Sequence, residues 1–503
     1  MAVVMGPVLS FRGAEGNIWR LSAVVTVDGA GAADKLAWSA NANLAQTKEV
    51  KPVLLRKFAI TGNPAALALR YDLEVPQTGK EQQIFYRIGT AKACSFFVPA
   101  KGGAPQMAYA SCNGFSDPKL MKKVGDKNRL WSLMSEKHEA RPYHLLLLGG
   151  DQVYSDSIWA EVKKLKEWTD LDWEERTEAK FAPMQQAVEK FYFDVYTERW
   201  AQPEMARMLA SVPSLMMWDD HDIFDGWGSY PKKQHECDVY QGIFRTAREY
   251  FRVFQLGIGP DEDRAGTLKG QEHFSFAHQV GNVGVLALDM RSERTQDQVM
   301  SLRSWNSVRD WMDSIKDCAH LLVLSSIPVV HPDFSSLEKF LGILPGQQEL
   351  EDDLRDHWNN RAHRQERLRF IHRLFDFSAE KKCRVTLLSG DVHVAAVGLL
   401  QSDRSDAPVN ARVINQLTSS GIVHPAPPGM VLYFLESVGD KVENVDRGVT
   451  AEMAEFPATY HRFIGARNWL SLEPDDKNRI WANWHVEGEP KPYTKVVNGV
   501  SDT

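Results

Sequence analysis

Four short apolar segments of this 503-residue chain each end abruptly in residues whose side chains bind metal ions. The clearest is residues 144–154, in which four consecutive leucines are followed by two glycines. An unbroken apolar run predicts a strand that is buried on both faces, and the glycines let the chain turn sharply. Asp151 and Tyr154 follow in D-x-x-Y spacing. In open α/β folds ligands bind at this rim of the sheet.

The other three segments repeat the pattern. Residues 107–111 lead into Cys112, residues 213–218 lead into the run Asp219–Asp222, and residues 385–390 lead into Asp391 and His393. A single polar strand end would be ordinary, since every strand must emerge somewhere polar. Four ends with complementary ligand types predict one metal site that is built from strand ends.

The donor types indicate two different ions. A carboxylate has two oxygens, so Asp151 can bridge two cations. A tyrosine with its ordinary pKa of about 10 is a poor ligand, so Tyr154 indicates a strongly acidic ion, Fe³⁺. The Cys112 thiolate suits the same ion, and His393 completes this first site. Asp220 and Asp391 would hold a second, harder ion.

Two metal ions about 3.5–4 Å apart activate a hydroxide and hold the oxygens of a phosphoryl group. His221 is placed beside a ligand and can protonate a leaving alkoxide. Each residue also has a purely structural alternative. Tyr154 is then an ordinary loop aromatic, Cys112 a buried small hydrophobe and His221 part of a hydrogen-bonded turn.

Two questions stay open at the segment that follows residue 218. Asp219 or Asp222 can also act as a cap for the segment that follows. Spacing alone does not decide whether Asp219 or Asp220 faces the metal.

The surrounding sequence predicts an α/β protein with an N-terminal all-β domain. Strand-like runs separated by turn residues favour a small β-sandwich over residues 1–100, and residues 101–105 read as a linker. Strands and helices then alternate over a catalytic domain at 106–435, which carries a helical insertion at about 158–210. In the C-terminal segment, 436–503, a β-hairpin is expected to complete the second sheet.

Composition excludes several classes of protein. The chain is 43% hydrophobic and 25% charged, as in ordinary soluble globular proteins. Its net charge of −7 argues against sequence-specific nucleic-acid binding, which needs a basic surface. No run of about 20 apolar residues and no signal peptide is seen, so we expect no membrane span and a cytoplasmic location. The five cysteines form no C-x-x-C pair; four of them read as reduced thiols, and Cys112 is the exception because of its place at a strand end. Nothing indicates the oligomeric state.

At its metal-ligand motifs the chain resembles the PhoD-like alkaline phosphatases, a branch of the calcineurin-like metallophosphoesterases. The resemblance implies an αββα sandwich and hydrolysis of phosphate monoesters and diesters at alkaline pH. It also implies Fe³⁺ with one or more Ca²⁺ ions, and Zn²⁺, Mn²⁺ and Mg²⁺ are the alternatives for the second ion. The matching strings are Ala110-Ser111-Cys112, Gly149–Asp156, Trp218–Asp222, Leu288–Arg291 and Leu388–His393.

The resemblance also assigns roles to residues. Cys112, Asp151, Tyr154 and His393 resemble the iron ligands. Asp151, Asp220 and Asp391 resemble the ligands of the neighbouring ion. His221 matches the family's acid. Arg291 falls in an arginine motif and is expected to hold a substrate oxygen, with a surface ion pair as its alternative.

The chain departs from the family pattern in two ways. Asp225 and Gly226 stand where the family commonly has asparagines, which puts any calcium contact there in question. The secretion signal of many members is missing, which favours an intracellular substrate. The leading hypothesis is a binuclear metallophosphoesterase that acts on a phosphorylated small molecule, lipid or polymer. The alternatives are a non-catalytic scaffold or partner-binding member of the same fold, and a metal-dependent hydrolase of another ester bond.

Overall fold

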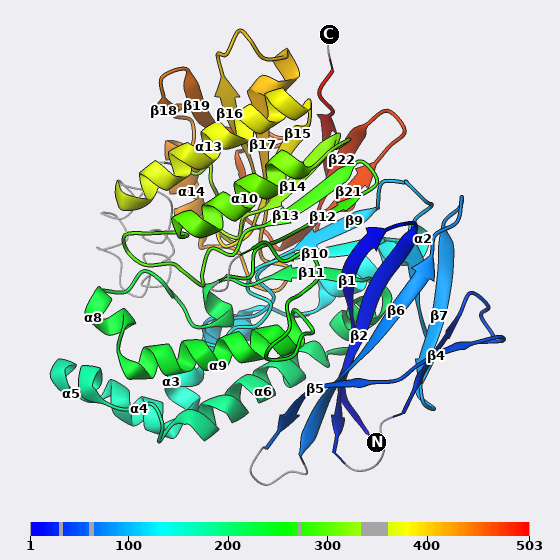
Figure 1. The fold of residues 1–503 in the computed structure, drawn as a ribbon. Helices are drawn as coiled ribbons and strands as arrows, with labels where there is room; N and C mark the ends of the chain where they lie inside the picture. Colours follow the sequence, from blue (N-terminus) through cyan, green and yellow to red (C-terminus); the bar gives the residue numbers. More distant parts are fainter. Residues whose placement is uncertain (1, 30–33, 60–64, 270–272, 333–360, 502–503) are drawn as a thin grey trace.

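Two large β-sheets lie face to face at the centre of the molecule, with helices outside them (Figure 1). The structure is a computed structural model, and it describes residues 2–29, 34–59, 65–269, 273–332 and 361–501. The first sheet is covered by helices α2 (Arg129–Ala140), α6 (Gln185–Trp200) and α7 (Pro203–Ser211), and the second by α10 (Leu302–Ser314) and α13 (Arg361–Lys381). This is the predicted αββα sandwich.

The first sheet has ten strands. Their order is β23 (Tyr493–Asn498), β22 (Arg479–Val486), β21 (Asn468–Pro474), β9 (Met107–Ala110), β10 (Leu145–Gly149), β11 (Ser214–Met217), β1 (Val3–Glu15), β2 (Ile18–Asp28), β6 (Ala66–Pro76) and β5 (Val53–Phe58). The four-leucine strand is β10, which is buried throughout and lies parallel to β9 and β11. The ends of β9, β10 and β11 therefore meet at one edge.

The second sheet has nine strands. Its order is β12 (Phe276–Val280), β13 (Val283–Ala287), β14 (His320–Leu324), β15 (Arg384–Ser389), β17 (Val413–Ser419), β16 (Ala395–Ser402), β19 (Val449–Ala454) and β18 (Glu443–Asp446), and β20 (Phe463–Ile464) pairs with β16. Strands β13, β14, β15 and β17 are parallel. The carboxyl end of β15 carries Asp391 and His393.

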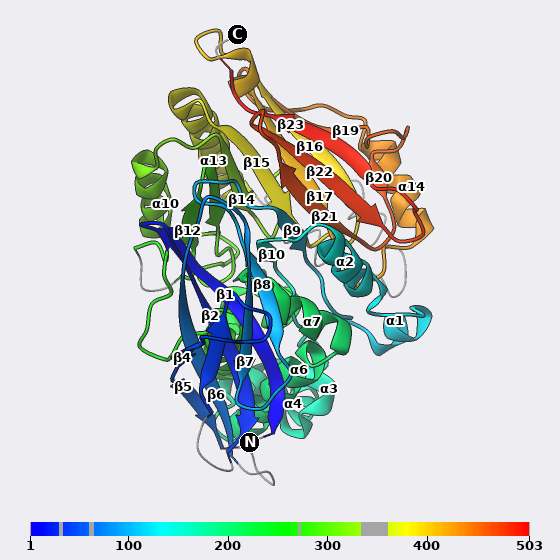
Figure 2. The ribbon, with the colours of Figure 1, turned by 90° about the vertical axis from the view of Figure 1, so that its right-hand side faces the viewer.

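The all-β character predicted for residues 1–100 is confirmed, and two sheets face each other there (Figure 2). The smaller sheet has the order β4 (Lys48–Val50), β3 (Leu36–Ser39), β7 (Gln82–Ile88) and β8 (Cys94–Val98). The larger one continues directly into the ten-stranded sheet. Ser10 of β1 pairs in parallel with Ser214 of β11. The Oγ of Ser214 also donates a hydrogen bond to the Leu9 carbonyl at 2.7 Å.

The predicted C-terminal hairpin is present as β21 and β22, but it does not complete the second sheet. Leu470 of β21 pairs with Tyr109 of β9, so the hairpin extends the first sheet. The second sheet ends instead in β19 and β18. The reason is that β9 has only one edge covered by β10, and the hairpin covers the other.

The predicted insertion is helical and packs against the loops at the strand ends. In chain order the helices are α1 (Pro118–Lys123), α2 (Arg129–Ala140), α3 (Ile158–Glu161), α4 (Lys163–Thr169), α5 (Trp173–Glu178), α6 (Gln185–Trp200), α7 (Pro203–Ser211), α8 (Lys232–His235), α9 (Asp238–Phe254), α10 (Leu302–Ser314), α13 (Arg361–Lys381) and α14 (Gly429–Val438), with short 3-10 turns η1 (Asp220–Asp222) and η2 (Val409–Arg412). Trp200 of α6 donates to the Gln152 carbonyl at 3.2 Å. Trp159 of α3 packs edge-on against Phe224 at 5.1 Å.

Among the residues that the structure describes, no helix combines the length and the apolarity needed to cross a membrane.

Candidate metal centre

The backbone at the strand ends is held in a rare conformation. Cys112, Asp151, Asp391 and His393 have positive φ angles of 55°, 54°, 69° and 53°. A residue other than glycine in this region costs about 1–3 kcal/mol and persists only where its surroundings impose it. All four are predicted ligands, so the strain falls where the sequence predicts chemistry.

The acidic side chains converge. One ligand atom each of Asp151, Asp220 and His221 lies within 4.8 Å of the others, and the same holds for Asp219, Asp220 and Asp391. All five residues are buried. Asp220 belongs to both groups. This favours Asp220 over Asp219 as the residue that faces the metal.

Cys112 and His393 lie at the same edge. Cys112 Sγ is 3.4 Å from Asp151 Oδ2 and 3.0 Å from Ser420 Oγ. The same Ser420 hydroxyl accepts a hydrogen bond from the His393 backbone amide at 2.9 Å. A separation of 3.4 Å is compatible with two donors on one ion that has bonds of about 2.0–2.3 Å.

The donor set fits a metal ion. Asp151 Oδ1 and both ring nitrogens of His393 are buried and have no hydrogen-bond partner among the described residues. Each such atom costs about 1–3 kcal/mol if it stays unsatisfied. Cations would satisfy these atoms, because carboxylate oxygens and neutral imidazole nitrogens are metal ligands.

The pKa shifts of the predicted ligands also fit a metal ion. Burial, and then the neighbouring Cys112, raises the pKa of Asp151 well above its usual value. Burial also raises the pKa of the Cys112 thiol and lowers the pKa of His393 far below its usual value. A cation reverses the first two effects, since it stabilises carboxylate and thiolate.

Tyr154 lies in a row of stacked rings. Its ring centroid is 4.3 Å from that of His221 and 5.6 Å from that of His424, which in turn lies 3.7 Å from the His393 ring. Gly114 makes room for Tyr154, because a Cβ at position 114 would lie 2.4 Å from Tyr154 Cδ2. The structure thus brings Tyr154 beside the acidic groups, and His424 links it to His393.

His221 is oriented by a carboxylate that the sequence analysis did not single out. His221 Nδ1 lies 2.8 Å from Asp156 Oδ2, and Asp156 Oδ1 accepts from the Asp225 amide at 2.8 Å. Burial alone would lower the pKa of His221, but the charges of Asp156 and Asp220 outweigh it and raise the pKa well above its usual value.

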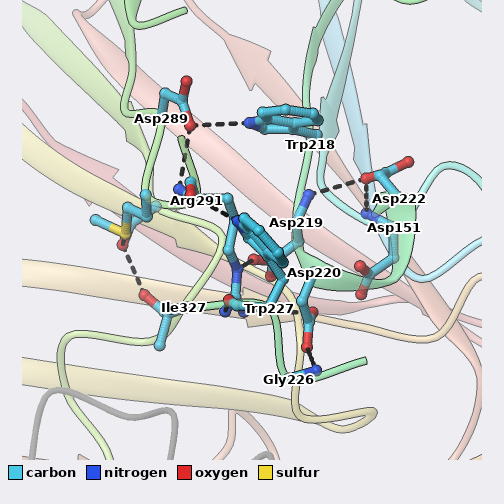
Figure 3. A network of polar contacts seen from close by, with 12 residues as sticks. Asp151, Trp218, Asp219, Asp220, Asp222, Gly226, Trp227, Asp289, Arg291 and Ile327 are labelled. Atoms are coloured by element: carbon cyan, nitrogen blue, oxygen red, sulfur yellow. Dashed lines mark hydrogen bonds and ion pairs between the residues drawn. The ribbon is translucent and has the colours of Figure 1, made fainter. Parts of the chain in front are cut away.

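Asp222 ties the two acidic loops together. Its carboxylate accepts hydrogen bonds from the backbone amides of Asp151 and Asp219, both at 2.9 Å (Figure 3). It also accepts from the amides of Gln152 and Val153 and from Gln255 Nε2. Of the two residues considered as caps, Asp219 is the N-cap of η1, and Asp222 completes the capping box by accepting from the Asp219 amide. The Asp222 carboxylate also reaches the loop after β10.

Arg291 lies behind the acidic residues. Its Nε donates to Asp219, its Nη2 is 3.3 Å from Asp220 Oδ1, and its Nη1 donates to the Trp227 carbonyl at 3.0 Å (Figure 3). The side chain is fully buried. This burial favours neither the predicted substrate contact nor a surface ion pair, and it points to charge compensation within the cluster.

Two functional candidates were missed in the sequence. Asp156 lies two residues after Tyr154 in the same loop, and His424 follows the end of β17, a fifth strand end with a metal-ligand side chain. The strand-end pattern could have found His424. Asp225 was left open; its carboxylate is in neither acidic group among the described residues.

The two-sheet sandwich and its cluster of acids and histidines at the strand ends define a metallophosphoesterase fold. The chain belongs to the PhoD related phosphatases, whose family model matches residues 80–348 and 341–449. A curated relative, the uncharacterized protein YGR266W of Saccharomyces cerevisiae, is 28% identical over 496 residues, which cover 80% of this chain and 70% of that protein.

Solved structures agree on the fold. The structure of PhoD matches with a TM-score of 0.60 at 13% identity, over 99% of this chain and 92% of that chain. Purple acid phosphatase PPD1 from yellow lupin (Lupinus luteus) seeds matches with a TM-score of 0.52 at 10% identity, over 97% and 73%. At these identities the likeness concerns the fold. The family membership supports phosphoester hydrolysis in general.

Proposed function

We propose that this protein hydrolyses phosphate monoesters and diesters at a centre of two metal ions. The observation that carries the proposal is the convergence on Asp220 of two groups of candidate ligand atoms, one with Asp151 and His221 and one with Asp219 and Asp391. They lie at the edge where the predicted ligands from β9, β10, β11 and β15 meet.

The donor types support a ferric ion beside a divalent one. Cys112, Asp151, Tyr154 and His393 would hold Fe³⁺, and Asp151, Asp220 and Asp391 would hold the second ion. Calcium is favoured there because the donors are all carboxylates, and Zn²⁺, Mn²⁺ and Mg²⁺ are the alternatives. When bound, such a pair supplies a nucleophile from water and polarises the phosphoryl oxygens.

The chain's own residues move the proton and hold the geometry. His221, oriented by Asp156 at 2.8 Å, would donate a proton to the leaving oxygen of the ester. Arg291 offsets the charge of Asp219, which keeps several carboxylates together in a buried space. Asp222 keeps the loops of Asp151 and Asp219 in register.

The substrate we propose is a phosphorylated small molecule, lipid or polymer in the cytoplasm. Support for this location comes from the cysteines, because all five are free thiols, including the buried pair Cys318 and Cys383.

Metal analysis with a chromogenic phosphate diester tests the proposal. Purified protein should contain iron and show tyrosinate charge-transfer absorption, which Tyr154→Phe should remove. Asp151→Asn should lower kcat/KM by at least about 10³-fold, since one ligand to both ions is lost. Asp310→Asn, an exposed carboxylate on α10, is the matched control. Wild-type activity in Asp151→Asn, or hydrolysis of carboxylate esters in place of phosphate esters, would contradict the proposal.

A further inference from the structure

A second polar recess lies between the N-terminal strands and the loop that follows α9. Two adjoining cavities of about 590 and 350 Å³ share Arg12, Arg20 and Ala265 as lining residues. We call the two cavities together the arginine trough. Among the described residues, its lining includes none of the predicted metal ligands.

The walls of the trough are well ordered by hydrogen bonds. Arg252 Nη2 donates to the carbonyls of Gly259, Pro260 and Glu262 at 2.7–2.8 Å, which fixes the loop. Gly266 has a φ of +80°, and a Cβ there would lie 2.8 Å from His278 Nε2. Glycine at this position therefore keeps the floor of the trough open beside His278.

Most charges along the trough are already paired. Arg20 pairs with Glu74 at 3.0 Å, and Arg70 pairs with Asp72 at 2.9 Å and with Glu262 at 2.6 Å. The two remaining carboxylates of the lining, those of Glu15 and Asp263, belong to exposed residues at its rim. Asp72 and Glu262 also act on the charge of Arg12, so the guanidinium without a nearby carboxylate among the described residues is that of Arg264.

Arg264 is buried with most of its donors unused. The residue is 3% exposed, its Nη2 donates to the Phe11 carbonyl at 3.0 Å, and its guanidinium lies 4.3 Å from the Phe276 ring centroid. Nε and Nη1 are buried without a hydrogen-bond partner among the described residues. Burial, and then the charge of Arg12, lowers the pKa of Arg264 far below its usual value. A buried cation with unused donors is costly unless an anion accompanies it.

Arg12 and His278 add further donors at the same place. Within the described ranges Arg12 donates to two neutral oxygens, Ser22 Oγ at 2.8 Å and the Gly257 carbonyl at 2.7 Å. His278 is 8% exposed, and its ring lies beside the backbone of Ala265 and near the charges of Arg264 and Arg12. Arg12 thus lines both cavities, Arg264 the smaller one and His278 the larger one. The nearest carboxylates, those of Asp72 and Glu262, act on Arg12 from a distance and form their ion pairs with Arg70 instead.

We propose that the arginine trough binds an oxyanion of the phosphate class through Arg264 and Arg12. Guanidinium donors form a planar fork that matches the oxygens of phosphate, and His278 adds one more contact. The volume of the trough admits a phosphate monoester as well as inorganic phosphate, and the two share the same recognising chemistry. The site goes beyond the proposed hydrolytic function and does not depend on it.

The test uses the Asp151→Asn protein. Its catalytic centre lacks a predicted ligand to both metal ions, so added phosphate should bind less at that centre and binding at the trough can be measured. Titration calorimetry with inorganic phosphate, and separately with adenosine 5′-monophosphate, should show one site. Arg264→Met should weaken that site at least about tenfold, because a charged hydrogen-bond donor is lost. Arg20→Met is the matched control in the same trough, and it should change the affinity less than about twofold, since Arg20 already pairs with Glu74.

A stability measurement separates a binding role from a structural one. In buffer without phosphate, Arg264→Met should unfold at the same temperature as its parent or higher, because it removes a buried uncompensated charge. Phosphate should then raise the unfolding temperature of the parent and leave Arg264→Met unchanged. If only one of the two ligands binds, the proposal holds and that ligand names the source. If neither binds, or if Arg264→Met destabilises the protein equally with and without phosphate, the proposal is overturned.

Discussion

Asp391 shows how the candidate centre is built at the scale of one residue. Its backbone has a φ of 69°, and its carboxylate faces those of Asp219 and Asp220. Both features are unfavourable in the absence of a cation, so the fold carries local strain at the place where a ligand is needed.

The strain at Asp391 can be measured by comparing two substitutions. Asp391→Gly and Asp391→Ala both remove the carboxylate, but only alanine keeps a Cβ at a positive φ. We expect Asp391→Gly to be more stable than Asp391→Ala by about 1 kcal/mol in urea unfolding of chelator-treated protein. Equal stabilities would show that the local backbone relaxes once the carboxylate is gone.

Asp156 gives a second prediction at this scale. Asp156→Asn keeps the shape of the side chain but removes the charge that orients His221, so we expect kcat to fall by about 10²- to 10⁴-fold. Iron content should stay at the wild-type level, because Asp156 is in neither acidic group among the described residues. Loss of iron together with activity would instead make Asp156 part of the metal site.

The residue types at the strand ends predicted which side chains would meet, since the carboxyl ends of neighbouring parallel strands share an edge. They did not predict the partners of these side chains. Arg291 reads as a substrate contact in the sequence, but it is buried against Asp219, a residue 72 positions away. Such a pairing depends on how two loops pack, and one loop's sequence does not contain that information.

At the scale of elements, the loops of the centre are held by their hydrogen bonds to Asp222 and by the helices around them. Asp222 accepts four backbone amides, and Gln255, at the end of α9, donates to it at 2.8 Å. Tyr192 of α6 donates to the Ile223 carbonyl. The helical insertion and α9 therefore hold the loops of the site in place through these hydrogen bonds.

Removing this support should unfold more than a loop. Asp222→Ala leaves four buried amides without an acceptor, and we expect a loss of about 3–5 kcal/mol in denaturant unfolding, with loss of bound metal. Gln255→Leu is the matched control, because it removes one donor to Asp222 and the hydrogen bond to the Tyr196 hydroxyl but leaves the four amides satisfied, and it should cost about 1–2 kcal/mol. A small effect of Asp222→Ala would mean that water replaces the carboxylate.

The individual strands were easier to predict than the strands with which they pair. Four leucines in a row can hardly be anything but a buried strand, and β10 is one. The hairpin of β21 and β22 was also predicted, but its sheet was not. The turn residues at 475–478 identify a hairpin without saying which exposed strand edge the hairpin will cover.

At the scale of the whole molecule, buried histidines make stability depend on pH. Burial lowers the pKa of His138 and that of His485 to about 4. Each is therefore neutral in the folded protein, and it takes up a proton below pH 6.5 only when the chain unfolds. Their contribution to stability is complete above pH 6.5 and is lost as the pH falls toward 4.

We expect the free energy of unfolding to fall by up to about 1.4 kcal/mol per pH unit for each such histidine between pH 6.5 and 4. Urea unfolding at a series of pH values measures the slope. His138→Gln keeps an acceptor for the Tyr143 amide, which bonds to His138 Nδ1 at 3.0 Å, and it should flatten the slope. An unchanged slope would show that His138 is already protonated in the folded protein.

The pairing of β1 with β11 has a consequence for how the chain is made. Strands β9, β10 and β11, whose ends carry predicted metal ligands, lie between a strand from the beginning of the chain and a hairpin from its end. During synthesis on the ribosome, β1 must wait about 200 residues for its parallel partner, and β9 stays uncovered until β21 emerges. A nascent chain released early would therefore expose the unpaired edge of β9 beside the loops that carry the predicted ligands. We expect such truncated products to aggregate through this edge.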